Sequence, residues 1–264
     1  MLAAPVVFFA FALGGIIHTA SGFGSALVAM PIVCLVIDLR MAAPLQALLS
    51  FVVSATVLYQ NWRALQWREA SRLILGAILG IPLGTLALKS VAPSLVTGCL
   101  GLMLLGYGLF EFRTRHRARS SSDSERAPGP DDPKSKIQNP KSGASWIAWL
   151  VGFAAGVVGG AYAADGPPLI IYGSVKRWPK ATFKSVLQSC FLVNGAFIVL
   201  CHGASGLITK SVLSYCLYAL PGLLIGIVVG SYVDRRLDHN RFRTFVLCLI
   251  LLLGASLLGR AVFG

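Results

Sequence analysis

Long runs without charge alternate with short charged segments along the chain. Between successive Asp, Glu, Lys and Arg residues, some of these runs have the length of a single membrane crossing. A helix needs roughly 20 apolar residues to span the hydrocarbon core of a bilayer. The six runs of this size are 41–62, 73–88, 90–110, 185–209, 211–233 and 244–259. The pattern therefore predicts an all-α, polytopic membrane protein.

Two further stretches are too long for one crossing. Residues 1–37 carry no charge, and residues 142–175 carry only Asp165. As continuous helices each would extend about 50 Å, whereas the hydrocarbon core is about 30 Å thick. Glycine, small residues and proline interrupt both stretches. Each is therefore predicted to be two half-helices that meet at a non-helical tip, either as a re-entrant hairpin or as a tight pair of spans.

The distribution of basic residues favours the hairpin. If each broken stretch returns to its own side and every other run crosses once, nineteen Lys and Arg residues fall on one side and four on the other. Such an asymmetry follows the positive-inside rule. If the broken stretches crossed instead, the basic loops 113–143 and 234–243 would lie on opposite sides. We therefore expect a cell (inner) membrane protein whose two termini lie on the non-cytoplasmic side.

The two halves of the chain resemble each other in the placement of glycine and proline. At a fixed spacing, Gly22 aligns with Gly159. Each half holds one broken stretch and three crossings, an odd number, so the second half would be inserted upside down. Inverted repeats with broken helices are typical of secondary transporters. We predict two inverted repeats, 1–112 and 144–264, with about eight membrane segments, joined by a flexible cytoplasmic linker at 113–143.

Composition excludes a soluble protein and narrows the partners. The chain is 56% hydrophobic and only 12% charged, whereas a soluble domain carries about a quarter charged residues. The chain has a net charge of +13, and its basic residues lie between apolar runs. They therefore indicate the topology of the chain in a lipid bilayer, and we expect no nucleic-acid partner. The cysteines form no CxxC or Cys/His cluster, and no catalytic or nucleotide-binding motif occurs. We expect no metal, no cofactor and no enzymatic activity.

Two buried ionisable residues are candidates for coupling to protons. Asp165 is the only acid well inside an apolar stretch, and a carboxylate at membrane depth is costly unless it has a function or a partner. It could bind a proton during transport, or it could cap the helix that would begin at Gly166. His18 lies in the first broken stretch and could also titrate, although a buried packing histidine is the alternative.

The glycine-rich breaks are candidates for anion binding. Half-helices that begin at a break present backbone N–H groups and the positive end of the helix dipole, both of which suit an anion. Close helix packing is the alternative role of the glycines, and interhelical hydrogen bonding is that of the nearby amides. The residues predicted on these grounds to bind substrate are Ser21, Gly22, Gly24, Ser25, Gln46, Gly159, Gly160, Asp165, Gln188 and Asn194. Ser50, Ser54 and Ser189 are lesser candidates.

Two glycine-rich motifs that end in proline, one in each half, carry a resemblance to a known family. They read GFGSALVAMP at 22–31 and GGAYAADGPPL at 159–169, and GPPLIIYG at 166–173 and PGLLIG at 221–226 add to them. In these motifs the chain resembles the sulfite exporter TauE/SafE family of membrane transporters. Carried over by position, the resemblance implies a pocket formed by Gly22, Gly24, Pro31, Gly159, Gly160, Gly166, Pro167 and Pro168.

Together these features favour a secondary transporter of small anions. The resemblance implies sulfur-containing or organic substrates such as sulfite, sulfoacetate and other sulfonates. Alternating access would take place around the two glycine-rich tips, with possible coupling to protons. An uncoupled anion channel with the same site is the first alternative, and an intramembrane enzyme that modifies lipid is a more distant one. The oligomeric state, including a homo-oligomer, is left open.

Overall fold

The computed structural model describes residues 3–21, 25–61, 67–122, 145–176, 178–236 and 239–263. Within these ranges the chain forms ten α-helices and no β-strand. The helices of the first half are α1 (Ala3–Ser21), α2 (Ala26–Cys34), α3 (Leu39–Asn61), α4 (Trp67–Ser90) and α5 (Pro93–Ser122). Those of the second half are α6 (Ser145–Tyr162), α7 (Gly166–Val175), α8 (Lys180–Ala204), α9 (Lys210–Arg236) and α10 (His239–Phe263).

The apolar runs predicted to cross the membrane are helical. In the described part of the chain, six helices are long and apolar enough to span a bilayer: α1, α4, α5, α8, α9 and α10. Five of them coincide with predicted crossings, and the sixth, α1, comes from the first broken stretch. The predicted crossing at 41–62 corresponds to α3, in which Leu39–Ala55 is an apolar helical segment. The chain is thus a multi-pass helical membrane protein.

The two broken stretches are interrupted, but not at their middles. Each consists of a long helix followed by a short one: α1 has 19 residues and α2 has 9, whereas α6 has 18 and α7 has 10. Each stretch thus contains two helices, as expected, but α1 and α6 are longer than half-helices and extend about 27 Å. Glycines such as Gly15 and Gly156 remain helical because they lie against a neighbouring backbone.

Two pairs of helices approach each other so closely that only glycine fits at the contact. A Cβ atom at Gly80 of α4 would collide with the carbonyl oxygen of Phe153 on α6, and one at Gly156 would collide with that of Ala77. Likewise, a Cβ at Gly226 of α9 would collide with the carbonyl oxygen of Ala12 on α1. The glycine stripes of α4 and α9 thus pack helices, as expected for small residues at such spacing.

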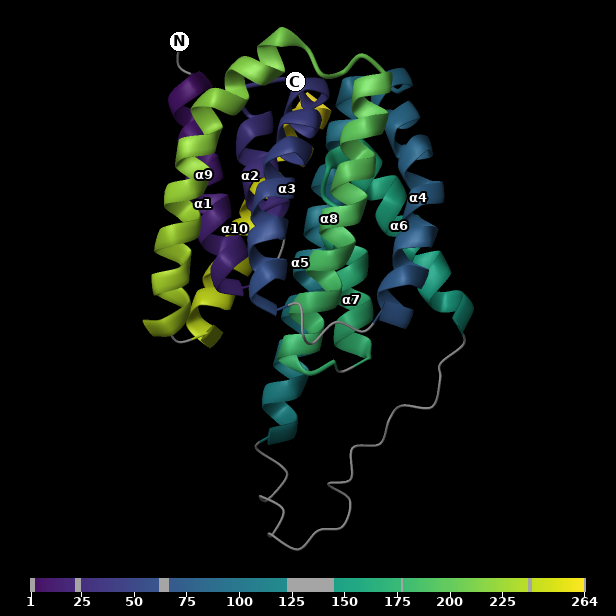
Figure 1. Ribbon diagram of the computed structural model, residues 1–264. Coiled ribbons are helices and arrows are strands. Elements are labelled where there is room, and N and C mark those ends of the chain that lie inside the picture. The colour runs from purple at the N-terminus through teal and green to yellow at the C-terminus, as the bar shows by residue number, and fades with distance from the viewer. Residues whose placement is uncertain are drawn as a thin grey trace, which may run out of the picture.

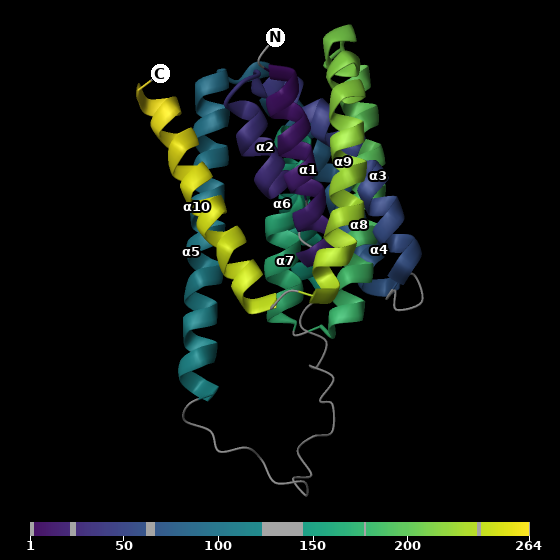
Figure 2. The ribbon, with the colours of Figure 1, turned by 90° about the vertical axis from the view of Figure 1, so that its left-hand side faces the viewer.

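The remaining contacts complete a bundle in which the halves are interleaved. Besides the α1–α9 and α4–α6 pairs at opposite sides of Figure 1, α3 packs on α8 and α5 packs on α10. Figure 2 shows α5 and α10 side by side, with both chain ends at the same end of the bundle. α5 continues to Ser122, so it extends into the segment predicted to be the linker.

Candidate functional site

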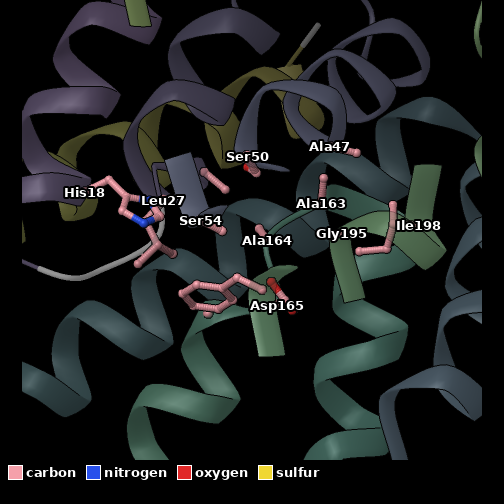
Figure 3. A pocket seen from close by; sticks show the side chains of 13 residues that line it. His18, Leu27, Ala47, Ser50, Ser54, Ala163, Ala164, Asp165, Gly195 and Ile198 are labelled. Carbon is pink, nitrogen blue, oxygen red and sulfur yellow. The ribbon is translucent and has the colours of Figure 1, made fainter. Parts of the chain in front are cut away.

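A cavity lies where both helix breaks meet the centre of the bundle (Figure 3). The first residues of α2 and the connection between α6 and α7 face each other across it, and α1, α3 and α8 close its sides. Its lining residues are His18, Ala26, Leu27, Ala47, Ser50, Ser54, Ala163, Ala164, Asp165, Gly166, Phe191, Gly195 and Ile198. The two predicted breaks thus converge on a single cavity.

His18 connects three helices through both of its ring nitrogens. The backbone N–H of Ser25, just before α2, donates to His18 Nδ1 at 2.9 Å, so Nδ1 carries no proton. His18 Nε2 therefore bears the hydrogen and donates it to Gln188 Oε1 on α8, at 3.1 Å. Since both nitrogens are engaged in this way, the imidazole is neutral in this structure.

The same contacts fix the orientation of the Gln188 amide. Its Oε1 accepts from His18, so its Nε2 must point the other way. Gln188 is fully buried, and Nε2 has no hydrogen-bond partner among the described residues. A buried donor without an acceptor is costly. Gln188 does not itself line the cavity, but its partner His18 and Phe191, one turn further along α8, do.

A second buried amide links the start of α2 to α3. Gln46 Nε2 lies 2.9 Å from the Ser25 hydroxyl and 2.6 Å from the Ser50 hydroxyl, and donates to both. Ser50 lines the cavity, as does Ser54 one turn further along α3. The Ser54 hydroxyl is buried and has no partner in the described ranges. This side of the cavity is therefore rich in uncharged hydroxyl and amide groups.

Asp165 stands at the N-cap position of α7 but does not cap it. Its side chain makes no capping hydrogen bond, because Pro167 and Pro168 occupy the positions whose N–H groups a cap would bind. Instead, Asn194 Nδ2 on α8 donates to Asp165 Oδ2 at 2.8 Å. The capping role considered for Asp165 is thus wrong, and the carboxylate faces the cavity with an amide partner.

The two short helices contribute differently to the cavity. The first N–H groups of any helix lack a partner within the helix, and those of α2 follow Ser25 directly. In the first turn of α7, two of these N–H groups are missing because of Pro167 and Pro168. The α2 side therefore offers the hydrogen-bond donors, and the α7 side offers the carboxylate.

Several predicted site residues do not line the cavity, among them the buried Ser25, Gln46, Gln188 and Asn194. Gly160 packs against α4, where a Cβ would collide with the carbonyl oxygen of Ile81, and its own carbonyl accepts from His202 Nε2 at 2.8 Å. Gly159 lies behind Asp165, with a Cβ position 3.1 Å from the aspartate Cβ. Pro31, Pro167 and Pro168 support the short helices without lining the cavity. Gly22, Gly24 and the side chain of Ser21 lie outside the described residues.

Other lining residues were not anticipated from the sequence. Phe191, Gly195 and Ile198 of α8 face the cavity together with Ala47 of α3 and Ala163. On α8 the three fall at helical spacing with Gln188, so the face that bears Gln188 could have indicated them. Ala47 and Ala163 carry no such signal.

Ala163 has a left-handed backbone conformation at the end of α6. Its φ is 49°, the only positive φ of a non-glycine residue in the described ranges. Its N–H donates to the Gly159 carbonyl at 2.7 Å, as expected for the residue after a helix end, a position that usually holds glycine. Backbone strain of this kind concentrates at functional sites, and here it shapes the connection that presents Asp165.

Taken together, the bundle is a polytopic membrane protein with a polar cavity at two helix breaks. The family model for the sulfite exporter TauE/SafE matches residues 7–257. The chain therefore belongs to the TauE/SafE sulfite exporter family, a family of membrane transporters and not of enzymes. Comparison with curated proteins and with solved structures found no match.

Proposed function

We propose that this protein is a secondary transporter that moves small sulfur-containing or organic anions across the cell membrane. The observation that carries the proposal is the cavity shared by the two helix breaks, with the unpartnered amide donor of Gln188 behind its lining residue His18. An anion at the α2 side would accept from Gln188 Nε2, from the Ser50 and Ser54 hydroxyls and from the first N–H groups of α2. Sulfite, sulfoacetate and other sulfonates offer the required oxygen acceptors.

Alternating access would take place around this cavity. The pairing of helices supports a chain built from two inverted repeats. When each helix is replaced by its counterpart in the other half, the α1–α9 pair becomes the α6–α4 pair, and the reverse. Under the same exchange, the α3–α8 and α5–α10 pairs map onto themselves. Transporters with such repeats rock one part of the bundle against the other around a site near the midplane. The basic loops would then be cytoplasmic, and both termini would lie on the other side.

Coupling to protons, through Asp165 or His18, belongs to this proposal. An anion in the cavity would face the Asp165 carboxylate, and two like charges about 6 Å apart repel by roughly 3 kcal/mol at an effective dielectric constant of 20. Protonation of one of these two residues would remove that repulsion or offset it. An anion channel could use the same cavity, but it would need no such charge compensation.

The test is counterflow of labelled sulfite into proteoliposomes that contain the purified protein. Unlabelled sulfite, sulfoacetate, sulfate and acetate are trapped inside in separate preparations. A carrier accumulates label above equilibrium when a true counter-substrate is trapped, and the effective compounds rank its specificity. Uptake that only equilibrates, at a high rate and independent of the trapped anion, would indicate a channel. Liposomes without protein are the control.

A further inference from the structure

The described lining of the cavity holds a carboxylate but no lysine or arginine, and His18 is its one histidine. Asp165 is only 8% exposed, and no Lys, Arg or His of the described chain forms an ion pair with it. A carboxylate in these surroundings requires a positive charge from outside the protein whenever an anion shares the cavity.

His18 is not arranged to supply that charge. Its Nδ1 accepts the Ser25 N–H, and its Nε2 donates to Gln188. A second proton on the ring would have to occupy Nδ1, where it would oppose the Ser25 N–H and disrupt the start of α2. Protonation of His18 would thus disturb the donor side of the site.

The amide that binds Asp165 has a vacant acceptor. Asn194 is fully buried, its Nδ2 donates to Asp165 Oδ2 at 2.8 Å, and its Oδ1 has no hydrogen-bond partner among the described residues. An ionised carboxylate has no hydrogen to offer this oxygen, whereas a protonated carboxyl group has one. A carboxylic acid and a primary amide can then form two parallel hydrogen bonds, N–H···O and O–H···O, which satisfy both groups.

We propose that Asp165 and Asn194 form the site that holds the coupling proton, with Asp165 carrying it and Asn194 Oδ1 accepting the hydrogen bond. This inference rests on the proposed transport function and identifies Asn194, predicted as a substrate ligand, as a positioning residue for the proton. The proton is taken from water on one side, forms an O–H bond with the carboxylate, and is returned to water on the other side. Each monovalent anion is thereby accompanied by one proton.

The other ionisable groups near Asp165 do not take over this role. α1 presents the neutral His18, α8 presents the buried thiol of Cys190, and α6 ends at the phenol of Tyr162. The residues by which α2 and α3 line the cavity carry no ionisable side chain. Lys184 of α8 acts electrostatically on His18, but it lies ten residues before Asn194, about 15 Å along the helix. Asp165 is therefore the acid of the cavity.

The first test needs no substrate, so it succeeds or fails independently of sulfite transport. Infrared difference spectra of the full-length protein in lipid are recorded as the pH is lowered, in H2O and in D2O. We expect a carbonyl band of a hydrogen-bonded protonated carboxyl group that is absent in Asp165→Asn. In Asn194→Leu the band should persist at the higher frequency of a carboxyl without that bond. An Asp165-dependent band that is unchanged by Asn194→Leu, or no such band, would overturn the proposal.

The second test measures coupling with labelled sulfite in proteoliposomes. Asp165→Asn removes the group that carries the proton, so accumulation driven by a pH gradient, measured relative to sulfite–sulfite counterflow by the same variant, should fall at least about tenfold. The matched control is Asp38→Asn, because Asp38 is exposed and its carboxylate accepts the Arg40 N–H at 2.7 Å, which Asn can also do. Proton-driven accumulation at the wild-type level in Asp165→Asn would contradict the proposal. Absence of counterflow in the wild type would instead count against the transport function.

Discussion

A backbone amide determines which end of the buried Gln188 side chain is left without a partner among the described residues. The Ser25 N–H can only donate, so His18 Nδ1 must accept, His18 Nε2 must donate, and Gln188 Oε1 must accept in turn. The free donor at Gln188 Nε2 is the end of this sequence of contacts. The proposed anion site thus contains no lysine or arginine among its described residues, which would favour release of the anion as well as its binding.

At Gln188 we predict that an added negative charge lowers sulfite affinity more than loss of the hydrogen-bond donor does. Gln188→Glu keeps an acceptor for His18 but replaces the donor with a negatively charged oxygen, so sulfite affinity should fall more than about tenfold, or 1.4 kcal/mol. Gln188→Met, which removes the donor without adding charge, should have a smaller effect. Isothermal titration with sulfite measures both. Equal affinities of the two variants would exclude a direct contact between Gln188 and the anion.

The left-handed backbone of Ala163 gives a second prediction. Ala163→Gly should leave the thermal unfolding temperature unchanged or raise it, because glycine adopts this conformation without a steric penalty. Ala163→Val should lower it, since a β-branched side chain is strained there by about 2 kcal/mol and the site is buried. A valine variant as stable as the glycine variant would argue against the strained connection.

The sequence could predict the types of residue in the site but not their partners. Asp165, His18 and the buried amides stand out because polar groups inside apolar runs are costly. Their contacts join positions as far apart as His18 and Gln188, 170 residues along the chain, and local pattern carries no information on such pairings. The missing cap at Asp165 was nevertheless visible in principle, because two prolines follow Gly166 and neither has an N–H group.

At the scale of helices, the glycine contacts act through their position and not through flexibility. We predict that Gly80→Ala lowers thermal stability markedly, because the added Cβ would collide with backbone atoms of α6 that cannot move aside. Gly106→Ala of α5 is the matched control, since nothing lies within 4 Å of a Cβ built there. It should be neutral or stabilising by up to about 1 kcal/mol through helix propensity. Similar unfolding temperatures for the two variants would contradict the close α4–α6 packing.

The helices themselves were predictable because charges delimit the apolar runs. The lengths of the helices around the breaks were not, because Gly15 of α1 and Gly152, Gly156 and Gly160 of α6 remain helical where a partner helix lies against them. A glycine pair in a sequence indicates either a break or a contact. Only the packing of α1 on α9 and of α6 on α4 decides between these two outcomes.

For the molecule as a whole, the proposed topology predicts the location of the chain ends. A reporter that fluoresces only in the cytoplasm should be active when inserted between α5 and α6 and inactive when fused after α10. A reporter enzyme that is active only outside the cytoplasm should give the reverse result. The reason is the excess of basic residues in the loops at one end of the bundle. Activity of the same reporter at both positions would exclude the two-sided arrangement.

Interleaving of the halves has a consequence for how the molecule comes together. Each of the four main helix pairs takes one member from each half, so neither half can bury its own glycine faces alone. The four pairs are formed by helices that come before and after the connection between α5 and α6. A gene divided there into two separate reading frames should therefore yield two fragments that are degraded when made singly and reconstitute a working carrier when made together.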